Sequence, residues 1–194
     1  MKEKFQYKDI FLVSVPIHAK FTGTIMKIIL VRHGEAEDAS LETTDQKRAL
    51  TAKGIDDIHK IGAFVRNSHI KIKEIYHSPY QRTKHTAHIL AEELNMSPES
   101  IFSAESLSAG SDCSNVLPKL NYCTNSDAII VVAHNPDITI FAAKLLGDSH
   151  FTENLHFSPG TTIALNVAKE KFCKGQILWA ISPDFLASSQ PLSV

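Results

Sequence analysis

The sequence is poor in cysteine and has no excess of either charge sign. Its three cysteines, Cys113, Cys123 and Cys173, are an odd number without a CxxC pair. This pattern is typical of free thiols in a reducing compartment and excludes a disulfide-built scaffold, so we expect a cytoplasmic protein. The 20 Lys and Arg residues are balanced by 21 Asp and Glu residues, and no basic run occurs. A nucleic-acid partner is therefore not expected, and any anion site must be local.

Long uninterrupted hydrophobic runs are also missing. The apolar stretch DIFLVSVPIHAKF near the N-terminus is broken by polar residues and by Pro16. It is too short for a membrane span and lacks the core of a signal peptide, so no membrane association is expected. The first clear strand follows Met26. We expect residues 1–25 to be an N-terminal extension without catalytic residues, and residues 26–194 to form the functional domain.

Metal-binding motifs are a third absence. The chain has ten histidines, and His85 and His88 lie three positions apart, but no HExxH motif and no cysteine cluster accompanies them. We therefore expect no metal ion and no other cofactor. A structural metal site at these two histidines is the alternative.

No repeat, low-complexity stretch or linker divides the chain, and 194 residues suit one domain with a sizeable core. From Met26 onward, short β-rich segments alternate with longer segments of helical periodicity. This order predicts an α/β three-layer sandwich, with a mostly parallel central sheet, helices on both faces and no large cap insertion. The strands are expected at KIILV, IKEIYH, AIIVVAH, TTIALNV and GQILWAI, the last two as a hairpin-like pair at one edge.

Three longer segments have helical spacing of apolar residues, namely residues 51–68, 78–95 and 135–147. The second and third segments each begin with a capping residue followed by proline. We therefore expect their N-caps and first helical residues at Ser78-Pro79 and Asn135-Pro136.

Three of the predicted strands lead directly into residues that can bind an anion or react with one. The first ends in Arg32-His33-Gly34-Glu35, the third in His134-Asn135-Pro136, and the second leads into a helix with Arg82 in its first turn. Ligands of open α/β sheets bind beyond the carboxyl ends of the strands. We therefore expect two imidazoles and two guanidiniums to meet in one crevice.

This set of side chains suits a phosphoryl group. Guanidinium forks match tetrahedral phosphoryl oxygens, and a neutral imidazole is a competent nucleophile toward phosphorus. Each of the motifs RHG, SPxxR and HNP has an ordinary explanation by itself, as a strand end, a helix start or a cap. Their occurrence together at three strand ends predicts a phosphoryl-transfer site.

The chain resembles the histidine phosphatase superfamily (phosphoglycerate-mutase-like), and within it the phosphohistidine phosphatases of the SixA type. The resemblance runs from about Met26 to about Ser182 and rests on MKIILVRHGEAE, DQKRALTAKG, IYHSPYQRTKHTA, VVAHNPDI and FSPGTTIAL. It implies a metal-independent phosphatase that forms a phosphohistidine enzyme intermediate.

The resemblance also implies a role for each matching residue. His33 would be the nucleophile, Arg32 and Arg82 would hold the phosphoryl oxygens, and His134 would donate a further hydrogen bond. Gly34 would let the backbone approach the phosphate closely. Asn135 would add to substrate binding, and Glu35 would either support the loop or lie exposed on the surface.

The general acid of larger family members has no clear counterpart. Asp112 and Glu105 are the candidates, and Asp112 is favoured because it lies in a loop that contains glycine. A phosphoramidate needs an acid less, since its nitrogen can arrive already protonated. The expected substrate is therefore phosphohistidine in a protein, such as a phosphotransfer domain. A phosphatase of small phosphoesters is the alternative, and a non-catalytic phosphate-binding interaction module is an alternative of a different class.

Overall fold

The computed structural model describes residues 25–40, 43–120, 128–154, 156–168 and 171–188. Apart from Ile25, which opens the first strand, the expected extension over residues 1–25 lies outside this range, as does Cys123.

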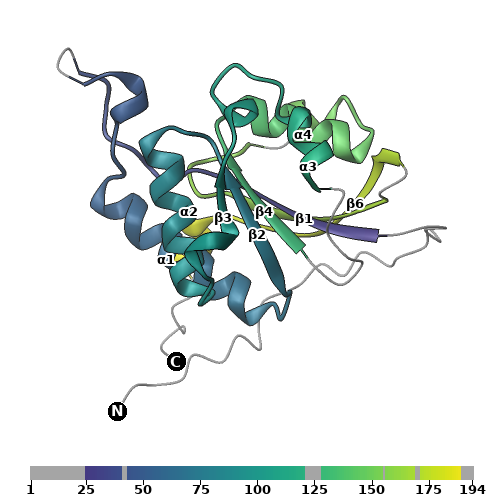
Figure 1. The fold of residues 1–194 in the computed structure, drawn as a ribbon, viewed down its shortest axis with the longest axis horizontal. Coiled ribbons are helices and arrows are strands. Elements are labelled where there is room, and N and C mark those ends of the chain that lie inside the picture. The colour runs from purple at the N-terminus through teal and green to yellow at the C-terminus, as the bar shows by residue number, and fades with distance from the viewer. Residues whose placement is uncertain (1–24, 41–42, 121–127, 155, 169–170, 189–194) are drawn as a thin grey trace.

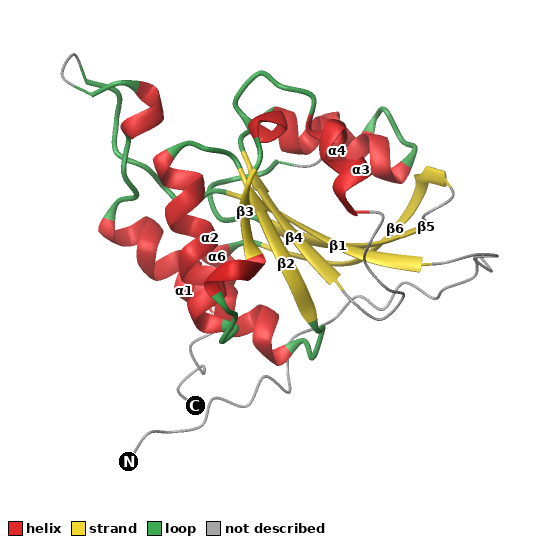
Figure 2. Cartoon of the chain, viewed as in Figure 1, coloured by secondary structure: helices red, strands yellow, loops and turns green. Residues whose placement is uncertain are grey.

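A six-stranded sheet forms the centre of the molecule, in the order β3-β2-β4-β1-β5-β6 (Figures 1 and 2). The neighbours among β3, β2, β4 and β1 pair in parallel, whereas β5 and β6 run antiparallel as an edge pair. The strands are β1 (Ile25–Arg32), β2 (Ile72–His77), β3 (Ile101–Ser103), β4 (Ala128–Ala133), β5 (Thr162–Ala168) and β6 (Lys171–Ile181). The mostly parallel sheet with a hairpin-like edge is therefore confirmed.

Helices cover both faces of the sheet, so the three-layer arrangement is confirmed as well. The α-helices are α1 (Ala52–Asn67), α2 (Gln81–Glu93), α3 (Leu117–Leu120), α4 (Asp137–Leu146), α5 (Phe151–Asn154) and α6 (Pro183–Ser188). Four short 3-10 helices join them, namely η1 (Asp45–Lys47), η2 (Pro98–Ser100), η3 (Glu105–Leu107) and η4 (Cys113–Val116). No large cap is inserted: the described part of the connection from β3 to β4 consists of η3, η4 and α3. Within the described ranges, no helix combines the length and the apolar character that a bilayer crossing needs.

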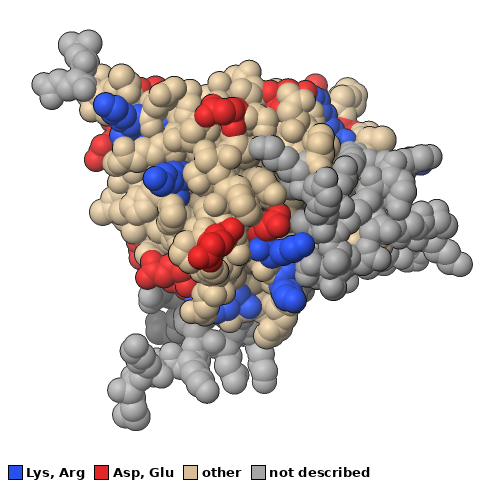
Figure 3. All heavy atoms as spheres, viewed as in Figure 1, with Lys and Arg blue, Asp and Glu red and all other residues tan. Residues whose placement is uncertain are grey.

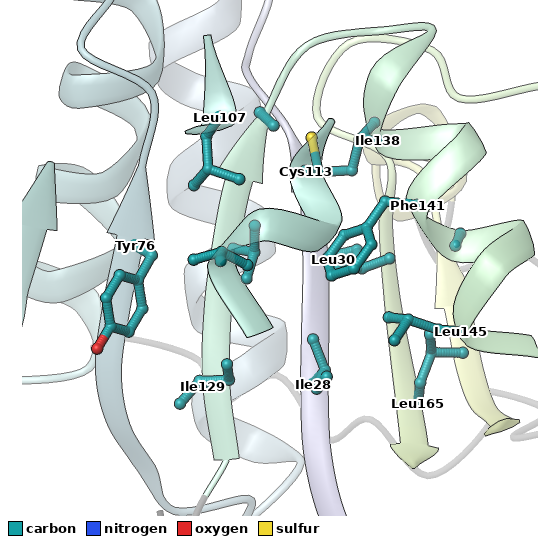
Figure 4. Close-up of a cluster of buried hydrophobic side chains, with 14 of the residues drawn as sticks. Ile28, Leu30, Tyr76, Leu107, Cys113, Ile129, Ile138, Phe141, Leu145 and Leu165 are labelled. Carbon is teal, nitrogen blue, oxygen red and sulfur yellow. The ribbon is translucent and has the colours of Figure 1, made fainter. Parts of the chain in front are cut away.

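Two apolar cores lie on opposite faces of the sheet because successive strand residues point to opposite sides. Ile29 and Val31 of β1 face the core beneath α1 and α2. Ile28 and Leu30 face the other core, where Phe141 of α4 packs (Figure 4). Both faces of β1 are thus buried, which fixes the strand whose end carries the RHG motif.

Two of the predicted helix starts are wrong by a few residues. α2 begins at Gln81 rather than Pro79, because Tyr80 is still extended (ψ 144°) and acts as N-cap. α4 begins at Asp137, after a cis peptide bond between Asn135 and Pro136. Because α2 starts late, Ser78 and Tyr80 lie outside it and contact the site described next.

Candidate active site

The carboxyl ends of three parallel strands meet at one edge of the sheet, as the sequence predicted. Arg32 at the end of β1 pairs with Ala133 of β4, and His77 at the end of β2 pairs with Val132. The next residues along these strands are His33, Ser78 and His134. The parallel register therefore brings the three motifs together.

His33 is a buried imidazole whose Nε2 is the nitrogen that carries the lone pair. Its Nδ1 lies 2.7 Å from the Gly34 carbonyl oxygen. A carbonyl oxygen only accepts, so Nδ1 carries the proton and Nε2 is the unprotonated nitrogen. Arg82 Nε donates to that nitrogen over 3.2 Å. Burial lowers the pKa of His33 to about 3, and the charges of Arg82 and Arg32 act in the same direction. The imidazole is therefore neutral at neutral pH.

Arg82 is held in one orientation by partners on several sides. Besides His33, its Nη1 donates to the Asp45 carbonyl oxygen (2.6 Å) and its Nη2 to the Asp45 carboxylate (3.1 Å). The guanidinium also lies over the Tyr80 ring, 5.0 Å from the centroid. Each Nη has two hydrogens, so one on each remains for a ligand.

Asp45 is the site residue that sequence reasoning missed. Its carboxylate bridges Arg82 and Arg48, with a distance of 2.8 Å from Asp45 Oδ1 to Arg48 Nη1. These two arginines hold its pKa below the usual range, although partial burial opposes them. The only signal for it was its place in the family motif DQKRALTAKG.

His134 lies beside His33, with the two ring centroids 5.3 Å apart. Its Nε2 is 2.8 Å from the Ser78 hydroxyl, while its Nδ1 is buried without a hydrogen-bond partner in the described residues. Burial lowers the pKa of His134 to about 4, with Arg82 contributing. A buried nitrogen without a partner beside His33 is free to form a hydrogen bond with a ligand.

Arg32 adds a second guanidinium without a carboxylate partner among the described residues. Its Nη1 donates to the Phe157 carbonyl oxygen (2.6 Å), and its Nε is buried and unpartnered. Burial and the charge of Arg82 lower its pKa. Two neighbouring guanidiniums of the same sign favour an anion between them.

The loop after β1 is fixed by close backbone contacts. Gly34 N donates to the Thr86 hydroxyl (3.1 Å), and a Cβ on Gly34 would come within 2.9 Å of the Gly54 carbonyl oxygen. Thr51, the N-cap of α1, donates its hydroxyl to Glu35 Oε1 (2.8 Å). Glu35 therefore supports the loop, and Gly34 is required by the space available.

Residues 28–108 match the family described as histidine phosphatase superfamily, branch 1. This match includes the RHG motif at Arg32–Gly34 and the SPxxR motif at Ser78–Arg82. Phosphohistidine phosphatase SixA of Escherichia coli (strain K12) is 26% identical over 164 residues, which cover 81% of this chain and 94% of that protein.

Solved structures share the fold of this chain. The tungstate complex of the protein histidine phosphatase SixA superposes with a TM-score of 0.72 at 23% identity, covering 83% of this chain and 99% of that one. Phosphoglycerate mutase from Plasmodium falciparum gives a TM-score of 0.60 at 19% identity, covering 89% and 98%. These likenesses show the α/β architecture.

The side-chain oxygen of Asn135, a residue expected to bind substrate, has a partner in the helix that follows. Asn135 is exposed, and its side-chain oxygen accepts a hydrogen bond from the Thr139 hydroxyl of α4 (2.5 Å). Asn135 thus follows His134 in the sequence, but its side-chain oxygen contacts Thr139 of α4 rather than the histidines.

The two candidate acids also have partners away from the histidines. Asp112 forms an ion pair with Lys144 (2.8 Å), which lowers its pKa to about 2 with help from Ser114. Glu105 accepts from the Ser108 hydroxyl (3.3 Å). Neither carboxylate has a recorded contact with His33 or His134, and an acid with so low a pKa as Asp112 is ionised at neutral pH.

In the part of the chain that the structure describes, no group of three or more His, Cys, Asp or Glu side chains is placed to hold a metal ion. Cys113 and Cys173 are separate free thiols, and burial raises the pKa of Cys113 to about 12.

Proposed function

We propose that this protein is a histidine phosphatase that hydrolyses a phosphoryl substrate through a phosphohistidine intermediate on His33, without a metal ion. The observation that carries the proposal is the state of the His33 ring. Its Nδ1–H is fixed on the Gly34 carbonyl oxygen, and its unprotonated Nε2 lies 3.2 Å from Arg82 Nε. A neutral imidazole with an oriented lone pair is the form required for attack on phosphorus.

In the first step, His33 Nε2 attacks phosphorus while the bond to the leaving group breaks on the opposite side. The Arg82 Nε–H, which donates to Nε2 before attack, becomes free to donate to a phosphoryl oxygen. The unused hydrogens on the Arg82 Nη atoms, the Arg32 guanidinium and His134 supply further donors around the same group. Such preorganised donors stabilise the charge on the transferring oxygens.

In the second step, water attacks the phosphohistidine. The P–N bond breaks, its electron pair returns to Nε2, and His33 returns as a neutral imidazole that keeps its Nδ1–H. Inorganic phosphate leaves as dihydrogen phosphate, which carries the oxygen and both hydrogens of the water. The lowered pKa of His33, about 3, favours that neutral form as the leaving group.

We further propose phosphohistidine in a protein as the substrate. The two candidate acids are engaged away from the histidines, and Asp112 is ionised. A substrate whose leaving nitrogen arrives protonated does not require them. The similarity to SixA, a phosphohistidine phosphatase by name, supports the same choice. Among the described residues no large cap encloses the strand ends, which suits a side chain presented from a protein surface.

The test compares kcat/KM at equal pH for a phosphohistidine phosphotransfer domain, phosphoserine and a sugar phosphate. We expect the phosphohistidine protein to be preferred by more than about tenfold, equivalent to ~1.4 kcal/mol in barrier, with no loss of rate in EDTA. Preference for a small phosphoester by the same margin would establish the alternative phosphatase function. Absence of turnover on all three would favour the non-catalytic binding module.

A further inference from the structure

A groove of about 600 Å³ lies beside the active site, between η1 and the first turns of α2. Apart from Pro79, its lining residues are polar or basic. Those used below are Gln46 and Lys47 of η1 and Gln81, Lys84, His85 and His88 of α2. The volume falls within the range of sites that bind whole ligands and exceeds what a single phosphoryl group fills.

The four α2 residues form one continuous stripe. Positions 81, 84, 85 and 88 follow the spacing that places residues on one face of a helix, over a length of about 10 Å. Arg82 and Thr86, on another face of α2, are buried against His33 and Gly34 in the loop after β1. The same helix thus presents Arg82 to His33 and the stripe to the groove.

The groove carries positive charge that nothing in the described residues neutralises. Lys47 and Lys84 are exposed and have no ion-pair partner there, and no carboxylate lines the groove. Three other lysines, Lys53, Lys60 and Lys144, are each paired with an aspartate. Figure 3 shows Lys and Arg atoms at the upper left, over the region of η1 and α2.

Asp45 does not cancel these charges, although it directly precedes the groove residue Gln46. Its carboxylate is already shared by Arg48 and Arg82. Gln46 directly follows Asp45 and Gln81 directly precedes Arg82, and Asp45 and Arg82 are hydrogen-bonded to each other, so the groove adjoins this pair of site residues.

We propose that this groove binds an acidic segment of the phosphorylated protein substrate, next to the phosphorylated side chain. This inference rests on the proposed function and names the surface that would distinguish a protein substrate from a small phosphoester. Lys47 and Lys84 steer and hold the acidic segment, while the catalytic residues act on the phosphoryl group.

The experiment uses the full chain with Lys47 and Lys84 both changed to Glu. The matched control changes Lys71 and Lys174 to Glu, which alters net charge equally. Lys71 precedes β2 and Lys174 lies in the first part of β6, so both exposed lysines are at the end of the sheet opposite the site. The probes are a phosphohistidine phosphotransfer domain and p-nitrophenyl phosphate.

The groove variant should have kcat/KM on the phosphotransfer domain about tenfold below that of the control at low ionic strength, and the gap should narrow as salt screens the charges. Its rate on p-nitrophenyl phosphate should stay within about twofold of the control. Equal rates of the two variants on the phosphotransfer domain would overturn the docking inference. So would an equal loss on both probes, since the lysines would then act on the chemistry.

A wild-type chain that turns over neither probe would instead contradict the proposed function. Binding of the unphosphorylated domain, measured by fluorescence anisotropy, then tests the groove without catalysis. Weaker binding by the groove variant than by the control supports the inference. Equal or unmeasurable binding by the wild type and both variants contradicts it.

Discussion

Acidification from pH 7 to pH 5 should destabilise the fold through the two histidines of the site. His33 and His134 are only 8% and 2% exposed, and burial lowers their pKa values to about 3 and about 4. In the unfolded chain each has an ordinary pKa of about 6.5. The folded pKa is thus depressed, so the unfolded state takes up protons first. The stabilisation is fully present above about pH 6.5 and is lost as pH falls toward the folded values.

The size of the effect follows from proton linkage. At pH 5 both histidines are almost fully protonated in the unfolded chain and still mostly neutral in the fold. Each then lowers the free energy of unfolding by about 2 kcal/mol relative to pH 7. His77, whose pKa burial also lowers, acts in the same direction. The carboxylates of Asp45 and Asp112 have lowered pKa values and titrate below this window.

The assay is chemical denaturation at the two pH values, followed by fluorescence of Trp179, the only tryptophan, which packs edge-on to Phe64. His33→Gln should reduce the loss of stability between pH 7 and pH 5 by about 2 kcal/mol. His156→Gln, a change at an exposed histidine, should lose as much stability between pH 7 and pH 5 as the wild type does. The reasoning would be refuted if the wild-type protein were equally stable at the two pH values. It would also be refuted if the His33 variant lost as much stability between pH 7 and pH 5 as the wild type.

Substitutions at three positions, Arg82, Asp45 and Gly54, test the geometry around His33. Arg82→Ala should remove about 2–4 kcal/mol of transition-state stabilisation, and Arg82→Lys should restore little of it because an ammonium lacks the planar fork. The control Arg66→Ala, at an arginine that pairs with Glu93 away from the site, should change kcat/KM little. Equal losses of kcat/KM at Arg66 and Arg82 would show that Arg82 does not act in the site. Asp45→Asn should lower kcat about fivefold, which corresponds to about 1 kcal/mol for a half-exposed ion pair. The Ki of inorganic phosphate should fall, because the Asp45 carboxylate no longer competes with phosphate for Arg82. Unchanged kcat and unchanged Ki would contradict the bridging role of Asp45. Gly54→Ala should lower the free energy of unfolding by about 1–3 kcal/mol, measured by denaturation, because the added Cβ would overlap the Glu35 carbonyl oxygen in the loop after β1. Wild-type stability of this variant would show that the loop can shift to make room for the methyl group.

The convergence of His33, Arg82 and His134 was predictable because each follows or adjoins an apolar strand in the sequence. Parallel strands share one carboxyl edge, so the motifs had to meet once the sheet was parallel. The strand β3 was missed, since three residues carry no periodicity and the strand exists only through pairing with β2. The start of α2 was misplaced because Ser78-Pro79 is a common cap sequence, whereas here the Ser78 hydroxyl contacts His134.

Long-range polar partners were the part that the sequence did not reveal. Asp45 meets Arg82 across 37 positions of the chain, and Asp112 meets Lys144 across 32. Neither spacing follows a helical or strand period. The favoured acid, Asp112, therefore looked available in the sequence and is committed to an ion pair in the fold.

Trapping the phosphoenzyme tests the central claim most directly. The protein is mixed with radiolabelled phosphohistidine substrate, quenched in alkali during turnover, and mapped by peptide analysis. The account predicts a label on His33 that survives alkali and is lost in acid, and no label or turnover in His33→Ala. A His33→Ala protein that turns over at the wild-type rate, or a label on another residue, would contradict it.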